Sequence, residues 1–196
     1  EETLGKDMTL IGGIPPWMQM YFDRLVEKTG KSVAELFPHL QVLVQGGVNF
    51  EPYKAKLFET IGKHIDTIEL FPASEGFFAF QDTREQPGLL LNTNSGIFFE
   101  FVPFNSDYFD ENGELINAHK AFTISEVKEG VDYALIITTN AGLWRYLIGD
   151  LVRFVDLEAH EIIISGRIKQ FLSLCGEHLS LDNINQALMK VAHEKK

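Results

Sequence analysis

The segment 72–76, Pro-Ala-Ser-Glu-Gly, places a carboxylate between two apolar runs that are typical of strands. A tight turn between strands is usually built with Gly or Asn and does not need a glutamate. Glu75 is therefore a candidate metal ligand, because a carboxylate is a hard oxygen ligand that suits Mg²⁺. The Ser74 hydroxyl could contact a phosphate, and the flat ring of Phe71 could stack on a base. The alternative is a plain strand–turn–strand with an exposed glutamate.

Gly46 and Gly47 directly follow a predicted buried strand at 40–45 and precede a predicted amphipathic helix at 51–65. In open α/β sheets, ligands bind at the carboxyl ends of strands, where paired glycines let a ligand approach the backbone. The alternative is a simple turn from strand to helix. Neither of the two standard glycine-rich phosphate-loop motifs is present in the chain.

Charged residues interrupt an otherwise apolar stretch at 138–154, where Arg145 and Asp150 occur. Burying a single charge is costly, so such residues tend to be paired or functional. Asp150 follows Gly149 and could accept hydrogen bonds from two vicinal hydroxyls, as in a ribose. The alternative is a structural ion pair between Arg145 and Asp150.

Arg167 follows a predicted strand and a glycine, where the composition of the chain changes. A guanidinium matches the paired oxygens of a phosphate, although a surface strand end is the alternative. The six histidines show no zinc-ligand spacing, so no zinc site is expected. Cys175 has no evident base partner, which favours a structural thiol over a nucleophile.

The elements that must position these residues form a mixed α/β pattern. Apolar spacing predicts a helix that begins near Pro16 and ends at Gly30. The second half is rich in strands, with a polar loop at 105–121. Strands are expected at 67–70, 76–81, 88–93, 96–103, 133–140, 149–156 and 161–167. After residue 167 we expect a short strand, a glycine turn and a helix capped by Asp182.

Composition narrows the class of protein. The chain has 196 residues, a net charge of −11 and a pI of about 4.9, which argues against non-specific binding to nucleic acid or anionic membranes. Its single cysteine excludes an internal disulfide and favours a reducing, cytoplasmic compartment. No apolar run is long enough to span a membrane, and the start has neither a Met nor a signal-peptide pattern. We therefore expect a piece of a longer cytoplasmic protein.

Taken in order, these motifs resemble the nucleotide-site motifs of the adenylate-forming superfamily, which includes acyl-CoA ligases and luciferase. The longer stretches QGGVNFEPY, ASEGFFAFQD, GIFFEFVP, TTNAGLWRYLIGDLVRF and GEHLSLDNINQAL resemble the auxin-responsive Gretchen Hagen acyl-acid amido synthetases, and their bacterial members most of all. The resemblance covers nearly the whole chain.

The resemblance implies that a carboxylic acid attacks the α-phosphate of ATP to give an acyl-adenylate and pyrophosphate. An amine, often an amino acid, then takes the acyl group and AMP leaves. By position, the resemblance implies that Gly46, Gly47 and Arg167 contact the nucleotide and that Phe71 stacks on the adenine. It implies that Ser74 contacts a phosphate, that Glu75 binds Mg²⁺ and that Asp150 binds the ribose. Lys169 would be the hinge. Glu75 and Arg167 would be the catalytic residues, since Mg²⁺ and arginine neutralise developing phosphate charge.

The same resemblance implies a domain division. Residues 1–166 correspond to the later part of a large nucleotide- and acyl-binding domain, and 167–196 to the hinge and the start of a small C-terminal domain. The Ser/Thr/Gly-rich phosphate loop and the catalytic lysine of the family are missing. We therefore expect this chain alone to be inactive, and to self-associate through exposed apolar surface.

Two other functions stay open. An acyl-CoA ligase would share the adenylation motifs and differ in its acceptor. A non-catalytic interaction module on the same fold would explain the missing phosphate loop, but it would not explain why Glu75, Asp150 and Arg167 are present.

Overall fold

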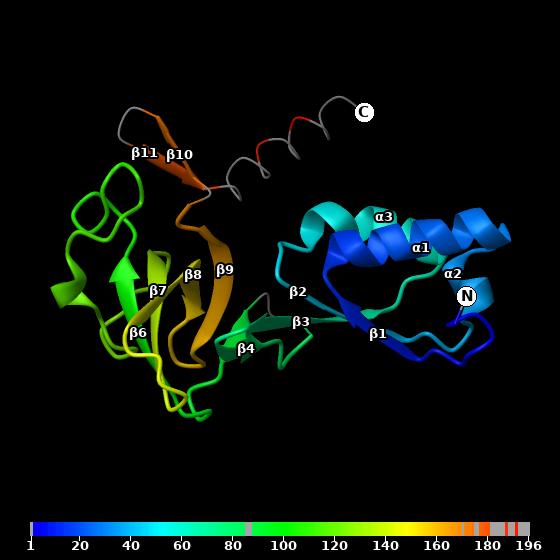
Figure 1. Cartoon of the computed structure of the whole chain (residues 1–196), viewed down its shortest axis with the longest axis horizontal. Helices are drawn as coiled ribbons and strands as arrows, with labels where there is room; N and C mark the ends of the chain where they lie inside the picture. Colours follow the sequence, from blue (N-terminus) through cyan, green and yellow to red (C-terminus); the bar gives the residue numbers. More distant parts are fainter. Residues whose placement is uncertain are drawn as a thin grey trace. The chain divides into compact units, whose positions relative to one another are not determined.

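The structure is a computed structural model that describes residues 2–84, 88–169, 171–174 and 177–180 and the single positions 187 and 191. It divides into two compact units, Glu1–Ser74 and Glu75–Lys196. The first unit contains all the long helices of the described chain, and the second is built mainly of strands (Figure 1). This is the mixed α/β fold that the sequence predicts.

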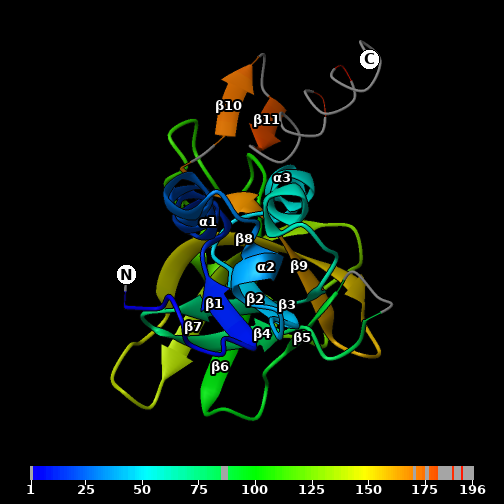
Figure 2. The same ribbon diagram turned by 90° about the vertical axis from the view of Figure 1, so that its right-hand side faces the viewer.

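The first unit is a parallel sheet covered by helices. Strands β1 (Leu10–Gly13), β2 (Val42–Gly46) and β3 (Asp66–Ala73) pair in parallel in the order β1-β2-β3. Helices α1 (Pro15–Thr29) and α3 (Glu51–Ile61) lie side by side over one face of this sheet (Figures 1 and 2). A hydrophobic core lies between them, with Met18, Phe22, Leu25, Leu43, Phe50, Leu57 and Ile61 among its buried members.

Glycines end both long helices. Gly30 adopts a left-handed conformation with φ of 67° after α1, as the sequence predicts, and its N–H donates to the carbonyl of Val26. Gly62 does the same after α3 with φ of 84°, so this helix ends before the predicted boundary at residue 65. The short helix α2 (Val33–Leu36) was not predicted, although its Ser32 and Glu35 form a capping box.

The second unit is an antiparallel sheet. Its strands follow the order β4-β5-β9-β8-β7-β6, formed by β4 (Gly76–Phe80), β5 (Leu89–Leu91), β6 (Ile97–Pro103), β7 (Asp132–Thr139), β8 (Tyr146–Asp156) and β9 (Glu161–Arg167). A 3-10 turn, η1 (Ala118–Lys120), lies between β6 and β7. Strands β10 (Phe171–Leu174) and β11 (Glu177–Ser180) form a separate antiparallel pair.

Aromatic side chains fill one side of this sheet. Phe101 packs edge-on against both Tyr133 and Phe154, and Phe78 packs edge-on against Phe99. A second buried cluster contains Val102, Ala134, Ile136, Leu151 and Ile168 and is covered by Phe104, Tyr108 and Leu115. The polar segment between β6 and β7 therefore carries apolar residues that close this part of the core.

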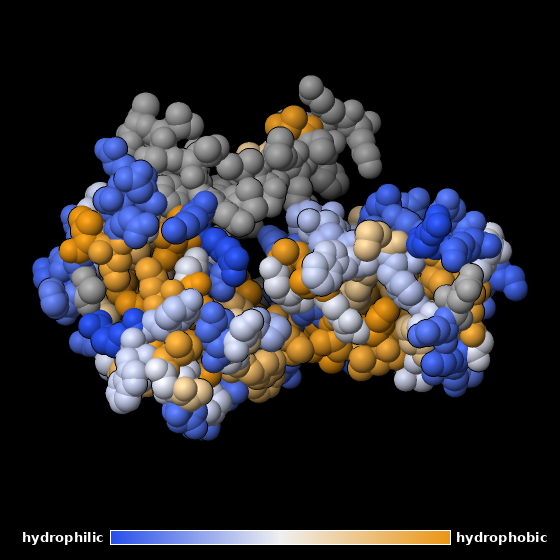
Figure 3. Space-filling view, in the orientation of Figure 1, coloured by the Kyte–Doolittle hydropathy of each residue, from blue (hydrophilic) through white to orange (hydrophobic). Residues whose placement is uncertain are grey.

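Apolar residues also reach the surface of the first unit. Hydrophobic side chains gather on the side of the β1–β3 sheet that faces away from α1 and α3 (Figure 3). Leu10 on β1 is 54% exposed and Ile68 on β3 is 37% exposed. Trp17 and Met20 on α1 are also strongly exposed. Self-association through exposed apolar surface stays a prediction.

The structure differs from the predictions at several strands. No strand was predicted at β1, and β3 continues through Pro72 to Ala73, so the turn before β4 contains only Ser74 and Glu75. Strand β11 was not predicted. Asp182 and most of the helix that it was predicted to cap lie outside the described residues, as does Cys175; Ala187 and Val191, which belong to the predicted helix, are described and are helical. The predicted domain boundary at 166–167 falls within the second compact unit and stays a prediction.

Candidate active site

A buried carboxylate and a half-exposed guanidinium meet on neighbouring strands of the second unit. Asp150 on β8 lies directly opposite Arg167 at the end of β9. The Arg167 Nε–H donates to Asp150 Oδ1 over 2.6 Å. The Asp150 side chain is 8% exposed and that of Arg167 is 60% exposed, so the pair presents the arginine to solvent and holds the aspartate inside. A charge-assisted bond of this kind is strong and directional.

Irregular pairing on both sides of Asp150 shapes this part of the sheet. The register of β8 against β7 shifts between Ala134 and Ile136, and its register against β9 shifts between Leu151 and Val152. Gly149 has φ of 90°, a conformation that favours glycine. The Ile168 N–H donates to the Gly149 carbonyl over 2.9 Å, which ties the end of β9 to this glycine. Bulges of this kind commonly re-aim side chains near functional sites.

The sequence suggested an ion pair between Arg145 and Asp150 as an alternative; among the described residues, Asp150 instead pairs with Arg167 and Arg145 with Glu100. Arg145 instead donates from Nε to Glu100 Oε2 over 3.0 Å, and its backbone N–H donates to Thr138 Oγ1. Its φ of 46° is unusual for a residue other than glycine and places it in the turn that precedes β8. The hydrogen-bond partner of Asp150 is thus Arg167.

Glu75 belongs to the same unit and acts electrostatically on the same arginine. The pKa of Arg167 is raised, first by its hydrogen bond to Asp150 and then by the charge of Asp150; burial opposes this rise, and the charge of Glu75 adds a smaller contribution to it. The guanidinium is therefore fully charged at any physiological pH. The structure pairs two of the predicted site residues, Asp150 and Arg167, and the charge of a third, Glu75, acts on the same guanidinium.

A single carboxylate is compatible with Mg²⁺ but does not form a metal cage. Among the described residues, no group of three or more His, Cys, Asp or Glu side chains is arranged to hold a metal ion. Mg²⁺ in nucleotide sites is commonly held by one or two carboxylates, with phosphate oxygens and water completing its shell. Glu75 is half-buried at the turn before β4 and fits that limited role.

Gly46 and Gly47 each have a structural reason to be glycine. Gly46 lies opposite Leu70 on β3, and a Cβ at Gly46 would approach the Leu70 carbonyl oxygen to 2.3 Å. Gly47 has φ of 83° at the end of β2. These constraints explain both glycines without a ligand, so their contact with a nucleotide stays a prediction.

The remaining predicted residues have different surroundings. Phe71 is 3% exposed on β3, so its ring would have to become accessible before a base could stack on it. Ser74 is exposed in the turn after β3. Lys169 is 82% exposed, and its Nζ lies 3.7 Å from Glu114 Oε1. The stacking, phosphate and hinge roles of these residues stay predictions.

Two polar residues of the first unit escaped the sequence reasoning. Gln45 on β2 is 3% exposed, and Glu69 lies opposite it on β3. The sequence feature that could have pointed to them is a glutamine at the end of an otherwise apolar strand, directly before Gly46. A buried polar side chain at the carboxyl end of a parallel strand is a candidate ligand contact.

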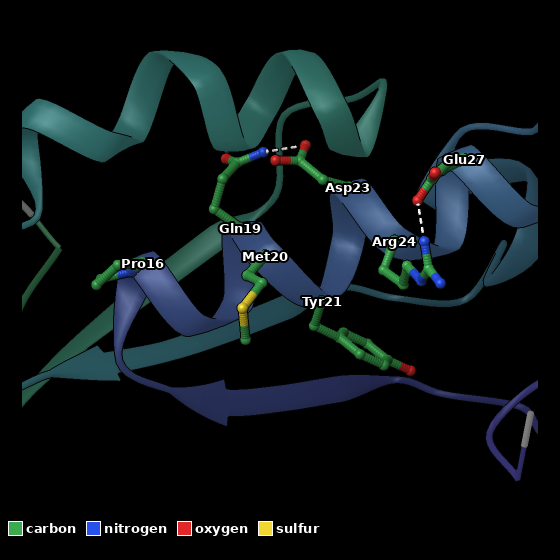
Figure 4. A pocket seen from close by; sticks show the side chains of 7 residues that line it. All are labelled: Pro16, Gln19, Met20, Tyr21, Asp23, Arg24 and Glu27. Atoms are coloured by element: carbon green, nitrogen blue, oxygen red, sulfur yellow. Dashed lines mark hydrogen bonds and ion pairs between the residues drawn. The ribbon is translucent and has the colours of Figure 1, made fainter.

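A hollow of about 890 Å³ lies along α1 and is separate from these residues (Figure 4). Pro16, Gln19, Met20, Tyr21, Asp23, Arg24 and Glu27 line it. Gln19 donates from Nε2 to Asp23 Oδ1 over 2.7 Å and to Thr60 Oγ1 on α3 over 2.8 Å. Its lining comes from one helix and contains none of the predicted site residues.

In the part of the chain that the structure describes, no helix has the length and apolar character needed to cross a bilayer.

Sequence comparison identifies relatives of this chain. Residues 90–166 match the GH3 family central domain, a segment that contains Asp150 and ends one residue before Arg167. Jasmonoyl–L-amino acid synthetase JAR6 of Nicotiana attenuata is 30% identical over 127 residues, which cover 62% of this chain and 21% of that protein. The chain thus spans about a fifth of the length of this curated relative.

Solved structures confirm the fold. The GH3.15 acyl acid amido synthetase superposes with a TM-score of 0.61 at 20% identity, covering 83% of this chain and 29% of its own. A 2-hydroxyisobutyryl-CoA ligase in complex with R3-HIB-AMP gives a TM-score of 0.62 at 14% identity, covering 93% of this chain and 37% of its own. The described fold therefore resembles that of these two enzymes, an acyl acid amido synthetase and a CoA ligase.

Proposed function

We propose that this chain, a homologue of the GH3 acyl-acid amido synthetases, forms part of an enzyme that adenylates a small carboxylic acid with ATP and passes the acyl group to an amine or amino acid. The observation that carries the proposal is the Asp150–Arg167 pair, with Glu75 close enough to act on the same guanidinium. The proposal concerns the full-length protein, because the chain spans only part of its relatives.

Asp150 is the residue that accepts hydrogen bonds from the ribose hydroxyls. Arg167 holds its Oδ1 in place, and a carboxylate has lone pairs on both oxygens for accepting hydroxyl hydrogen bonds. Its burial keeps the carboxylate fixed, so little ordering is needed when a sugar binds. This arrangement suits the two vicinal hydroxyls of a nucleotide.

Arg167 is the residue that neutralises negative charge on the phosphates. Nε–H is used by Asp150, and the guanidinium has further N–H donors at its exposed end. A fixed cation aimed at developing charge lowers the barrier to transfer of a nucleotidyl group. The bond to Asp150 limits the rotamers of the arginine and so pre-organises it.

Glu75 would hold Mg²⁺, which supplies charge neutralisation at phosphate oxygens when bound. Phe71, Ser74, Gly46 and Gly47 keep the nucleotide-contact roles implied by their positions, and Lys169 keeps that of the hinge. ATP and Mg²⁺ are the expected cosubstrate and cofactor.

The test is ATP–pyrophosphate exchange by the full-length protein with a panel of carboxylic acids. Exchange should depend on one class of acid and fall about 100-fold or more in Glu75→Gln, the order of loss that follows removal of one charge-stabilising group. Glu158→Gln is the matched control, because Glu158 is an exposed glutamate in the turn between β8 and β9. A folded full-length protein that neither binds ATP nor exchanges pyrophosphate with any acid would contradict the proposal.

The acceptor separates the proposed activity from that of an acyl-CoA ligase, which shares the fold. Product formation in the presence of the activated acid should depend on an amine and should not depend on CoA. A CoA-dependent thioester product would overturn the amide-forming part of the proposal and leave the adenylation step intact.

A further inference from the structure

Gln45 and Glu69 form a polar pair near the carboxyl end of strand β2, in the parallel sheet of the first unit. The two residues are direct partners on β2 and β3, one position before Gly46 and Leu70. Strand β2 ends at Gly46, so the pair lies where the carboxyl end of this strand turns toward α3. In open parallel sheets this end of the strands is the usual place for ligands.

The side-chain oxygen of Gln45 is an unused acceptor. Gln45 is 3% exposed, and its Oε1 has no hydrogen-bond partner within the described structure. Leaving a buried acceptor unsatisfied costs about 1–3 kcal/mol, so such groups are uncommon unless another molecule satisfies them. A leucine or methionine would fill the same space at the end of an apolar strand without this cost.

Glu69 places a carboxylate beside that acceptor. Burial raises the pKa of Glu69, a hydrogen bond from Gln45 opposes this rise, and the charge of Glu51 at the start of α3 adds to it. A carboxylate shielded from water interacts more strongly with a hydrogen-bond donor or a cation than an exposed one does. Gln45 and Glu69 together therefore offer acceptor oxygens from two side chains.

We infer that Gln45 and Glu69 form a subsite that binds the amino group of a small ligand. An amino group carries at least two N–H donors, so it can donate to Gln45 Oε1 and to the Glu69 carboxylate together. Because Oε1 is covered in the described structure, binding requires a side-chain movement that exposes this oxygen to the ligand. The inference deepens the proposed function, since its substrates include two amino groups, that of adenine and that of the amine acceptor.

The experiment measures binding by calorimetry to the full-length protein, independently of catalysis. The probes are ATP, ITP (which lacks the exocyclic amino group of adenine), and L-amino acids with their N-acetyl derivatives. Dependence on the purine amino group assigns the subsite to the nucleotide, and dependence on the α-amino group assigns it to the acceptor. Either result supports the inference.

Gln45→Met removes the acceptor at nearly constant volume, and Glu69→Gln removes the charge. Loss of one hydrogen bond should weaken binding of the amino-bearing probe about tenfold and leave its analogue without the amino group unchanged. Gln41→Met, at an exposed position before β2, is the control. The melting temperature of each variant shows whether it is folded.

Two results would overturn the inference. One is that folded Gln45→Met and Glu69→Gln proteins bind every probe as the wild type does. The other is that no probe binds the wild type with any preference for an amino group. Binding is read without adenylation, so a subsite that binds an amino group in a protein without pyrophosphate exchange would uphold this inference and count against the proposed function alone.

Discussion

Asp150 and Arg167 are separated by 16 intervening residues in the chain, and they lie directly opposite each other with a 2.6 Å hydrogen bond between their side chains. Replacing Arg167 with Met should leave a buried carboxylate without this partner and lower the free energy of unfolding by about 1–3 kcal/mol. The lower end is expected because the arginine is 60% exposed. Urea unfolding of the chain measures the effect.

A neighbouring ion pair provides the control for this first prediction. Arg153 on β8 donates to both carboxylate oxygens of Asp132 on β7, at 2.9 and 2.8 Å. Arg153→Met should also lower stability, but nucleotide affinity should fall only in Arg167→Met. Equal loss of nucleotide affinity in the two variants would show that Arg167 has no direct role at the nucleotide.

Gly46 is expected to tolerate no side chain. A Cβ there would lie 2.3 Å from the Leu70 carbonyl oxygen, so Gly46→Ala must push β2 and β3 apart. Overpacking of this kind costs about 1–3 kcal/mol, and the strand distortion places this variant at the upper end. Thermal unfolding followed by circular dichroism measures it.

Gly12→Ala serves as the matched substitution in the same sheet. Its Cβ would meet Val44 at an ordinary 3.7 Å, so we expect a change of only about 0.5 kcal/mol in either direction. If both alanine variants unfolded at the wild-type temperature, the close approach at Gly46 would not be a constraint on the fold.

Glu69 should make stability fall as the pH rises. Its pKa in the folded protein lies above the ordinary 4.5, chiefly through burial, so the folded state binds this proton more tightly than the unfolded chain does. The stabilisation from this group is fully present below pH 4.5 and is lost as the pH rises through the folded pKa. Glu69→Gln should flatten the decline.

The measurement is the free energy of unfolding from pH 4 to pH 8 for both proteins. Glu69→Asp keeps a titrating carboxylate at the position and should retain a decline. A wild-type curve with the same slope as that of Glu69→Gln would be inconsistent with a raised pKa at this residue.

The exposed apolar side chains of α1 should promote self-association of this chain. Trp17 is 66% exposed and Met20 is 68% exposed, next to the hollow along the same helix. Replacing both with Ser should lower the fraction of oligomer seen by sedimentation velocity. Trp144→Ser removes an 81% exposed tryptophan from the turn between β7 and β8 and should have a smaller effect. If Trp144→Ser lowered the fraction of oligomer equally, α1 would not be the specific contact surface.

The elements with strong local signals could be predicted from the sequence. Helix α1 has an apolar face with four-residue spacing and a glycine that ends it, and both features depend on residues close together in the chain. Strand β1 could not be predicted in this way, because its four residues include two glycines and its pairing with β2 joins residues about 30 positions apart. Long-range pairing overrides local propensity at such positions.

The candidate site was predictable in its residues but not in its contacts. Asp150 and Arg167 were singled out separately, because each charged residue interrupts or ends an apolar strand. Their pairing depends on the register of β8 and β9, which is shifted between Leu151 and Val152 and could not be read from residue types. The pairing of Arg145 with Glu100 likewise joins residues far apart in the chain and could not be read from residue types.

The antiparallel run β6-β7-β8-β9 has a consequence for folding kinetics. In this meander each strand pairs with the next strand in the chain, whereas β5 must find β9 across about 70 residues. The connections from β7 to β8 and from β8 to β9 are short, whereas the one from β6 to β7 is long, so the hairpins β7-β8 and β8-β9 can close at a low entropic cost before distant strands are recruited. The Asp150–Arg167 pair would thus form within the nucleus of the second unit, and mutations there would change the folding rate more than the unfolding rate.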